Sequence, residues 1–448
     1  MYLHHILNKI KRSEIILSVM TLSLGTIVSQ AIPIFASLIL ARLYSPVNYG
    51  DWGIFSSYAA IFTVFICGKY EYAILRPKRT IDALHLCCLS FLIGLSISLV
   101  LYVILLLFFL IDFSYVINIK GIRWLPVFIF MNGILQILIN YANRQEKYKA
   151  IAFSSVCRSC VQAISRISLG FGQIHSGLIY GALLGLVSGC ICLAKNIFSR
   201  RLVNAISWVQ IKKLIVEYKK FPLYEAPSGL LNVLSTNIPL LFLSYFFVKE
   251  YVGYFSMAVT ILYMPMSFIG IALGQVFYKK ACIWNDTKQI ADLALKMFRL
   301  TFWGGCIPVV FLVLFGQDIF ALLLGPHWKM TGEFATYLSI WLWLVLCFSP
   351  LSTIFLVKDK QRLGMILNGI MLILRVLAVV IGGYIFQSIF ITVIMYGVVG
   401  IIVWLIEGMY IWNLAKMKMS SYEYIYVCAL FSFLLLVWGM KISFFFNE

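Results

Sequence analysis

ALHLCCLSFLIGLSISLVLYVILLLFFLID, residues 83–112, decides the fold class, because this run exceeds the roughly 20 apolar residues that cross a bilayer as a helix. The rest of the chain has the same character: 62% of its 448 residues are apolar and only 12% are charged. Water-soluble domains carry about 45–50% apolar and roughly 25% charged residues. The composition therefore predicts an integral membrane protein built from helices.

Further apolar runs of spanning length follow one another along the chain. They cover residues 15–41, 48–68, 123–142, 151–170, 174–195, 226–247, 252–277, 297–323, 334–357, 363–386, 388–413 and 423–446. Basic residues precede the first run, but it is longer than the 7–15 apolar residues of a signal peptide, so we expect a retained span. The last run is interrupted by Lys441. The pattern predicts an all-α polytopic protein with 12–13 transmembrane helices.

The basic residues indicate orientation rather than a nucleic-acid partner. The formal net charge is +19, yet the Lys and Arg residues lie in short clusters between apolar runs and form no contiguous basic face. With the N-terminus in the cytoplasm, most of the 36 Lys and Arg residues fall in cytoplasmic segments. The positive-inside rule then predicts a multi-pass protein with a cytoplasmic N-terminus.

A long polar connection divides the chain into two sets of six spans. We expect an N-terminal six-helix bundle over 1–197, a cytoplasmic connecting loop over 198–222 and a C-terminal six-helix bundle over 223–414. The remaining segment, 415–448, is apolar and can form an extra span.

The two sets show signs of an internal repeat. SQAIPI at residues 29–34 is similar to STNIPL at 235–240, and GIFS at 53–56 is similar to GYFS at 253–256. Halves with the same orientation imply a pseudo-two-fold axis along the membrane normal, as in transporters with a central binding site. We therefore expect two pseudo-symmetric six-helix bundles around a central cationic cavity.

Arginines within the spans are the strongest functional signal. Arg158, Gln162 and Arg166 follow one another at a spacing of four, so they share one helix face. Aligning the halves places Arg375 at the position of Gln162. A charge deep in a span costs several kcal/mol unless it faces protein or a wet cavity. We interpret these arginines as phosphate-binding residues of a water-filled cavity; the alternative is snorkelling or pairing with carboxylates.

Uncharged polar residues form further stripes on neighbouring spans. A spacing of four again relates Asn132, Gln136 and Asn140. Such residues often serve only as contacts between helices, but next to an arginine face they favour contact with a polar ligand such as sugar hydroxyls. The candidates are Gln30, Asn132, Gln136, Asn140, Gln162, Asn232 and Asn368.

Two carboxylates are candidates for ion coupling, Glu225 and Glu71. Each lies beside basic residues, so the alternative to a proton- or cation-coupling role is an interfacial ion pair. The sequence has no Walker A motif and no HExxH or GxSxG motif. Cys157 and Cys160 form a CxxC pair, but no second pair or histidine cluster follows at zinc spacing. We therefore expect a secondary transporter without a cofactor or metal, not an enzyme.

Several short patterns together resemble one family. They are GT at 25–26, QAIP at 30–33, ARLYSP at 41–46, KYEYAILRP at 69–77, VGYF at 252–255, GQVFY at 274–278, and Gly325, Trp328 and Gly332. These patterns resemble bacterial O-antigen and polysaccharide flippases of the multidrug/oligosaccharidyl-lipid/polysaccharide exporter superfamily. The resemblance implies twelve or more helices around a cationic lumen and places Arg42, Glu71 and Arg76 on motif positions.

The resemblance also implies an activity and a setting. We expect alternating-access movement of undecaprenyl-diphosphate-linked oligosaccharide, an O-antigen or other surface polysaccharide unit, from the cytoplasmic to the periplasmic leaflet of a bacterial inner membrane. The partners expected are the lipid-linked substrate, membrane lipids, and a polysaccharide polymerase with its chain-length regulator. Arg158, Arg166, Arg375 and Arg42 would bind the diphosphate. The alternatives are a MATE-like multidrug exporter and a membrane polysaccharide polymerase or ligase.

Overall fold

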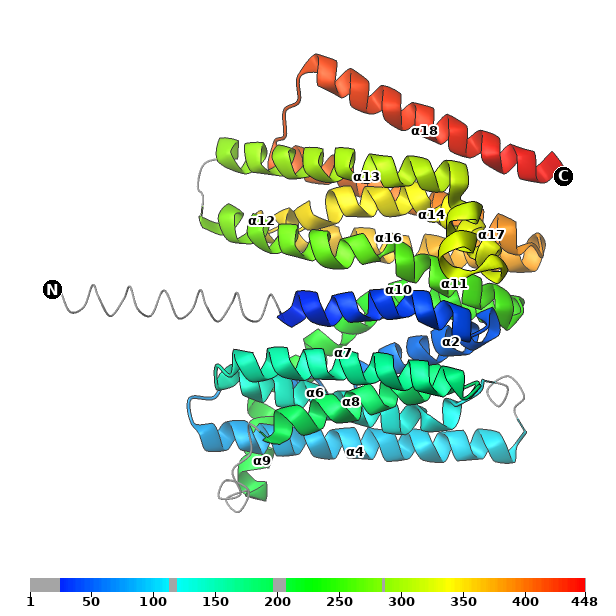
Figure 1. Cartoon of the computed structure of the whole chain (residues 1–448). Helices are drawn as coiled ribbons and strands as arrows, with labels where there is room; N and C mark the ends of the chain where they lie inside the picture. Colours follow the sequence, from blue (N-terminus) through cyan, green and yellow to red (C-terminus); the bar gives the residue numbers. More distant parts are fainter. Residues whose placement is uncertain (1–24, 113–118, 196–206, 284–286, 448) are drawn as a thin grey trace. The chain divides into compact units, whose positions relative to one another are not determined.

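A computed structural model describes residues 25–112, 119–195, 207–283 and 287–447 (Figure 1). Within these ranges the protein is built from helices and turns, with no strand. The predicted all-α membrane fold is confirmed. The helices divide into two compact units, each described by itself below.

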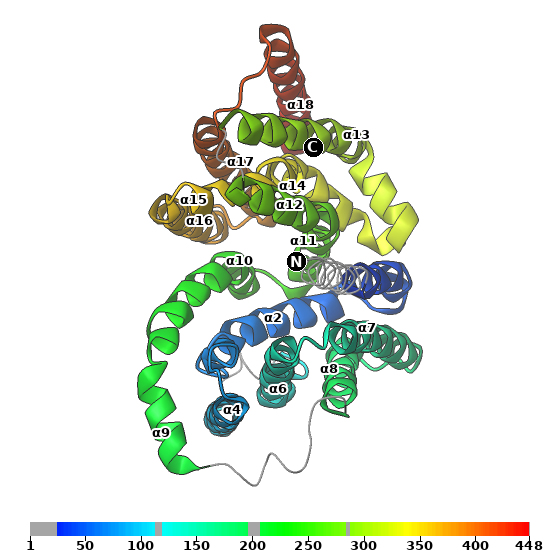
Figure 2. The same cartoon turned by 90° about the vertical axis from the view of Figure 1, so that its left-hand side faces the viewer.

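Unit 1 comprises the described residues up to Tyr44 together with Asp51–Asn237. Its helices are Gly25–Leu43, most of α2 (Pro46–Thr63), α3 (Tyr70–Ala73), α4 (Thr80–Leu110), η1 (Ile122–Trp124), α6 (Leu125–Arg144), α7 (Tyr148–Phe171), α8 (Gly177–Lys195), α9 (Trp208–Glu217), the π-helical turn η3 (Phe221–Glu225) and the first half of α10 (Ala226–Phe246). Four long helices, α4, α6, α7 and α8, run side by side and are seen end-on in Figure 2, whereas α9 lies to one side of them, next to α4.

Unit 2 comprises Ser45–Gly50 and the chain from Ile238 onward. Its elements after α10 are α11 (Lys249–Leu262), η4 (Met266–Gly270), α12 (Ile271–Ile283), α13 (Thr287–Leu324), η5 (Pro326–Trp328), α14 (Lys329–Phe348), η6 (Ser349–Leu351), α15 (Ile354–Val357), α16 (Gln361–Val380), η7 (Ile381–Ile385), α17 (Ile389–Ala415) and α18 (Ser421–Asn447). The central helix is α14, which is buried along almost its whole length and packs against α11, α13 and α17.

Among the described residues, ten helices are long and apolar enough to cross a membrane. Three predicted spans, 48–68, 151–170 and 252–277, do not belong to this set. The first two correspond to α2 and α7, whose polar residues lower the mean hydropathy. The third is divided by η4 into the shorter helices α11 and α12. These three segments are helical, but their sequences are not uniformly apolar, as expected of helices that face polar surroundings on one side.

The C-terminal run forms α18, which is attached to unit 2. The indole Nε1–H of Trp438 donates to the Thr336 carbonyl at 3.1 Å, and the Lys441 ammonium donates to the Leu314 carbonyl. At the other end of α18, Glu423 forms a two-pronged ion pair with Arg299. The apolar segment after residue 415 is therefore a docked helix of spanning length.

Candidate functional site: arginine–aromatic sites in both units

The arginine face of α7 packs on the glycines of α8. A Cβ added at Gly181 would lie 2.5 Å from Cγ of Arg166, and one at Gly185 would lie 2.7 Å from Cβ of Gln162. The glycine repeat of α8 therefore has a specific partner, since only a residue without a side chain lets α7 approach this closely. The α7 residues in this contact are half-buried: Arg158, Gln162 and Arg166.

Arg166 is held by three elements of unit 1. Its Nε–H donates to the Leu178 carbonyl of α8 at 2.9 Å, and its guanidinium carbon lies 4.4 Å from the centre of the Trp52 ring on α2. The Tyr44 hydroxyl donates to the backbone carbonyl of Arg166 at 2.7 Å. The guanidinium thus has a fixed direction and an aromatic face behind it. Such an arrangement orients the planar guanidinium for an anionic ligand with paired acceptor oxygens.

Arg158 lies two helical turns before Arg166 on the same face of α7. Its Cβ would be 3.3 Å from a Cβ added at Gly189, so its stem follows the same α7–α8 contact. In the described part of the chain, the Arg158 side chain forms no ion pair or hydrogen bond with a protein group. Its half-buried guanidinium therefore keeps its donors for another partner.

Arg375 is buried in an aromatic cage in unit 2. Only 4% of the residue is exposed. Its guanidinium carbon lies 4.7 Å from the centre of the Trp341 ring and 5.2 Å from that of Tyr396. Tyr263 packs edge-on against Trp341, with ring centres 6.1 Å apart. Each unit thus holds an arginine against aromatic rings inside its helical bundle.

The predicted polar residues differ in their surroundings. Asn132, Gln136 and Asn140 share a half-buried face of α6, where the Asn140 amide donates to the Gln136 carbonyl at 3.0 Å. Gln30 and Gln162 are also half-buried, whereas Asn368 and Arg42 are exposed. The side chain of Asn232 lies outside the described residues. Of the whole predicted set, the structure groups the α7 residues on one face and the α6 residues on another.

The two candidate carboxylates lie near the same end of unit 1. Glu71 on α3 is 1% exposed, and its Oε2 has no hydrogen-bond partner in the described part of the chain. Burial raises the pKa of Glu71, and the neighbouring Lys69 opposes this effect. Burial also raises the pKa of Tyr72, and the carboxylates of Glu71 and Glu225 raise it further. Both carboxylates therefore act on one tyrosine.

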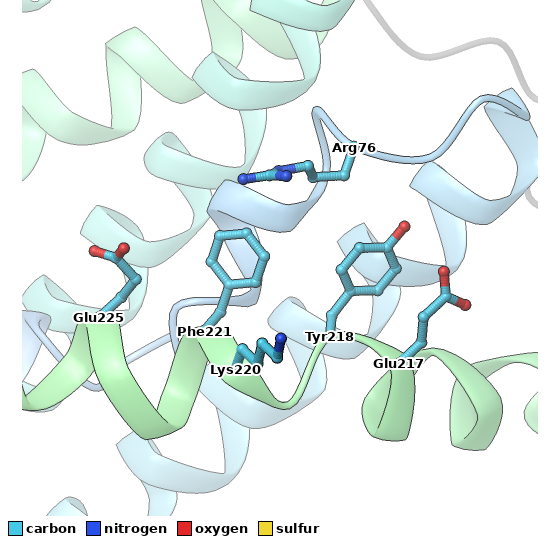
Figure 3. A pocket seen from close by; sticks show the side chains of 6 residues that line it. All are labelled: Arg76, Glu217, Tyr218, Lys220, Phe221 and Glu225. Carbon is cyan, nitrogen blue, oxygen red and sulfur yellow. The ribbon is translucent and has the colours of Figure 1, made fainter.

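Glu225 lines a cavity of about 340 Å³ that was not predicted from the sequence. The residues lining it are Arg76, Glu217, Tyr218, Lys220, Phe221 and Glu225 (Figure 3). The guanidinium of Arg76 lies 5.8 Å from the centre of the Phe221 ring. Arg76 belongs to the motif at residues 69–77, so the sequence marked it as a candidate residue. Its aromatic partner, Phe221, comes from a distant segment of the sequence.

A family model described as "Polysaccharide biosynthesis protein" matches residues 39–332. No curated protein sequence matches the chain significantly.

Solved structures share the fold at low sequence identity. An inward-facing MATE-family multidrug resistance transporter of the MOP superfamily aligns with a TM-score of 0.67 at 16% identity, covering 87% of this chain and 96% of the other. The lipid II flippase MurJ in an inward closed conformation aligns with a TM-score of 0.68 at 13% identity, covering 96% of this chain and all (100%) of the other. A mutant of the Vibrio cholerae MATE transporter VcmN aligns with a TM-score of 0.56 at 12% identity, covering 90% of this chain and 97% of the other.

Proposed function

Because this chain belongs to the polysaccharide biosynthesis protein family, we propose that it is a flippase for an undecaprenyl-diphosphate-linked oligosaccharide. The cargo would be an O-antigen or other surface polysaccharide unit. It would move from the cytoplasmic to the periplasmic leaflet of a bacterial inner membrane by alternating access. The N-terminus would be cytoplasmic, and a polysaccharide polymerase with its chain-length regulator would use the product.

The observation that carries this proposal is the pair of arginine–aromatic sites. Arg166 stacks on Trp52 in unit 1, and Arg375 lies against Trp341 and Tyr396 in unit 2. A guanidinium that stays charged inside a membrane protein needs an anionic or aromatic partner. A diphosphate offers two adjacent anionic groups with acceptor oxygens, to which arginine donates paired hydrogen bonds. Arg158 and Arg42 would extend this cationic path.

The remaining predicted residues have supporting roles in the proposal. Half-buried amides on α6 and α7, together with Gln30, Asn232 and Asn368, would contact sugar hydroxyls. Glu71 is buried without a partner for its Oε2 in the described residues, so it would bind and release the coupling proton, with Glu225 as a second carboxylate near the same end. The lipid tail would remain in the bilayer.

The test uses a bacterial strain whose surface polysaccharide depends on this chain. Arg166→Ala and Arg375→Ala should each abolish surface polysaccharide, measured by gel analysis of surface glycans, while the protein remains in the membrane fraction. The matched control is Arg123→Ala, since Arg123 lies at the same distance, 4.4 Å, from the ring of Phe109 but is exposed. Normal polysaccharide in both variants would contradict the proposed site.

The same strain separates the alternatives. A MATE-like exporter would raise resistance to cationic drugs, and this resistance would survive removal of the arginines, because a cationic drug gains nothing from a guanidinium. A polymerase or ligase would form sugar polymer from lipid-linked units when purified. Our proposal expects neither activity.

A further inference from the structure

The cavity beside η3 has a charge pattern that the proposed translocation path does not use. Arg76 and Lys220 supply two cations, and Glu217 and Glu225 supply two carboxylates. None of the four forms an ion pair within the described residues. Opposite charges that line one cavity without pairing leave both signs available to a ligand.

The charges are arranged along the cavity rather than mixed. Figure 3 shows Glu225 and Glu217 at opposite ends of the row, with Arg76, Phe221 and Lys220 between them. The ring centres of Phe221 and Tyr218 lie 6.3 Å apart, and both rings line the cavity. A complementary ligand has an anionic centre for the cations. It also carries a hydrogen-bond donor or cation that reaches a carboxylate or an aromatic face.

The cavity is fixed to unit 1 at the ends of its spanning helices. The Tyr70 hydroxyl of α3 donates to the Ile215 carbonyl of α9 at 3.2 Å, and Ile211 and Leu214 bury one face of α9. The other side of this segment exposes Trp208, Val216 and Leu223 by 66%, 64% and 60%. An amphipathic helix of this kind, with basic residues beside exposed apolar ones, lies in the interfacial plane of a bilayer. Headgroups occupy that depth.

The chain changes its helical geometry at the cavity. Phe221–Glu225 form a π-helical turn, which adds a residue to the turn and is frequent at functional sites. This turn carries Phe221 and Glu225 to the cavity wall.

From these observations we propose that the cavity binds the phosphoethanolamine headgroup of a membrane phospholipid. Arg76, which lies against the Phe221 ring, and Lys220 donate to the phosphate, and the ammonium pairs with Glu217 or Glu225. The acyl chains lie along the exposed apolar side chains of α9 and η3. The bound lipid holds α9 and η3 at the membrane surface, whichever cargo the chain transports.

The experiment is native mass spectrometry of the purified full-length chain in detergent with added lipids. Wild type should bind phosphatidylethanolamine more tightly than phosphatidic acid, which has the phosphate but no ammonium. Arg76→Gln/Lys220→Gln should weaken phosphatidylethanolamine binding about tenfold, equivalent to ~1.4 kcal/mol. Glu217→Gln/Glu225→Gln should remove the preference over phosphatidic acid.

The matched control is Lys212→Gln/Lys213→Gln, which removes two exposed cations of α9 that do not line the cavity. It should change binding by less than about twofold, well below the tenfold of the cavity pair. Phe221→Leu keeps every charge and should weaken binding about threefold, because Arg76 loses the aromatic face that positions it. Lipid binding is compared only among variants whose thermal stability is equal.

Three results would overturn the proposal. The first is equal binding of phosphatidic acid and phosphatidylethanolamine by wild type. The second is an equal loss in the cavity pair and in the α9 control. The third is displacement of phosphatidylethanolamine by a glycosyl-diphosphate lipid, which would make the transported lipid the occupant. Each is independent of whether Arg166 and Arg375 are needed for translocation.

Discussion

The guanidinium carbon of Arg166 lies 4.4 Å from the centre of the Trp52 ring, so a charge on α7 is held by an aromatic side chain on α2. Cation–π contacts contribute about 0.5–1 kcal/mol at exposed sites and roughly 2 kcal/mol when desolvated. Trp52 therefore orients the guanidinium that we propose binds the ligand.

Trp52→Leu should reduce surface polysaccharide without abolishing it. Loss of the stacking contact lets the guanidinium sample other directions, and the energy of the contact corresponds to about a 2- to 30-fold effect on transport. The measurement is the rate of polysaccharide appearance after induction of the variant. Trp124→Leu is the control, because Trp124 is an exposed tryptophan of the same unit. Equal rates in the two variants would contradict an orienting role.

Arg375→Met should abolish transport while leaving thermal stability equal to or above that of wild type. A buried charge costs several kcal/mol of solvation, and an apolar side chain of similar length fills the space between Trp341 and Tyr396 without that cost. Thermal unfolding of the purified protein and surface polysaccharide are measured in parallel. A strongly destabilised variant would show that Arg375 supports the fold instead.

Gly181→Ala and Gly185→Ala should each destabilise the protein by about 1–3 kcal/mol, because overpacking forces α7 and α8 apart. The added Cβ atoms would lie 2.5 Å from Arg166 Cγ and 2.7 Å from Gln162 Cβ. Gly304→Ala is the matched control, since a Cβ there meets nothing within 4 Å and alanine favours a helix. Thermal unfolding that ranks all three alike would show that α7 and α8 are not tightly packed.

Glu71→Gln should stabilise the protein at neutral pH and have no effect at low pH. Burial raises the pKa of Glu71 above its ordinary value of 4.5, so the folded state binds this proton more tightly than the unfolded state. The folded state therefore loses stability as pH rises from 4.5 through the raised pKa. Glutamine removes this penalty. The test is melting temperature against pH, with the exposed Glu146→Gln as control; parallel curves for wild type and Glu71→Gln would exclude the buried titration.

Hydropathy and the positions of basic residues predicted the helical membrane fold. They identified runs such as 83–112 because lipid contact demands apolar residues all round the helix. The same reasoning also predicted spans at α2 and α7. In these two helices, side chains such as Asp51 and Arg158 lower the mean hydropathy. Unit boundaries depend on packing instead: Ser45–Gly50 belong to unit 2 although the residues on both sides belong to unit 1.

Spacing predicted which residues share the face of α7 but not what lies opposite. A period of four was visible both in Arg158–Gln162–Arg166 and in the glycines of α8, yet no rule of spacing joins two such patterns. The aromatic partners carry even less signal, because Trp52 and Trp341 are distant in sequence from the arginines they contact. The cavity beside η3 requires a tertiary contact of Arg76 with Phe221 and was likewise absent from the sequence pattern.

The close fit of α8 against α7 has a mechanical consequence. A side chain reaches only a small part of the ~30 Å between the two leaflets, and α7 cannot turn about its own axis while Arg166 Cγ and Gln162 Cβ occupy the space that glycine leaves. Movement of the Arg166 guanidinium from one leaflet toward the other therefore requires that α7 and α8 move together as one rigid body. A crosslink between these two helices should leave the proposed transport intact.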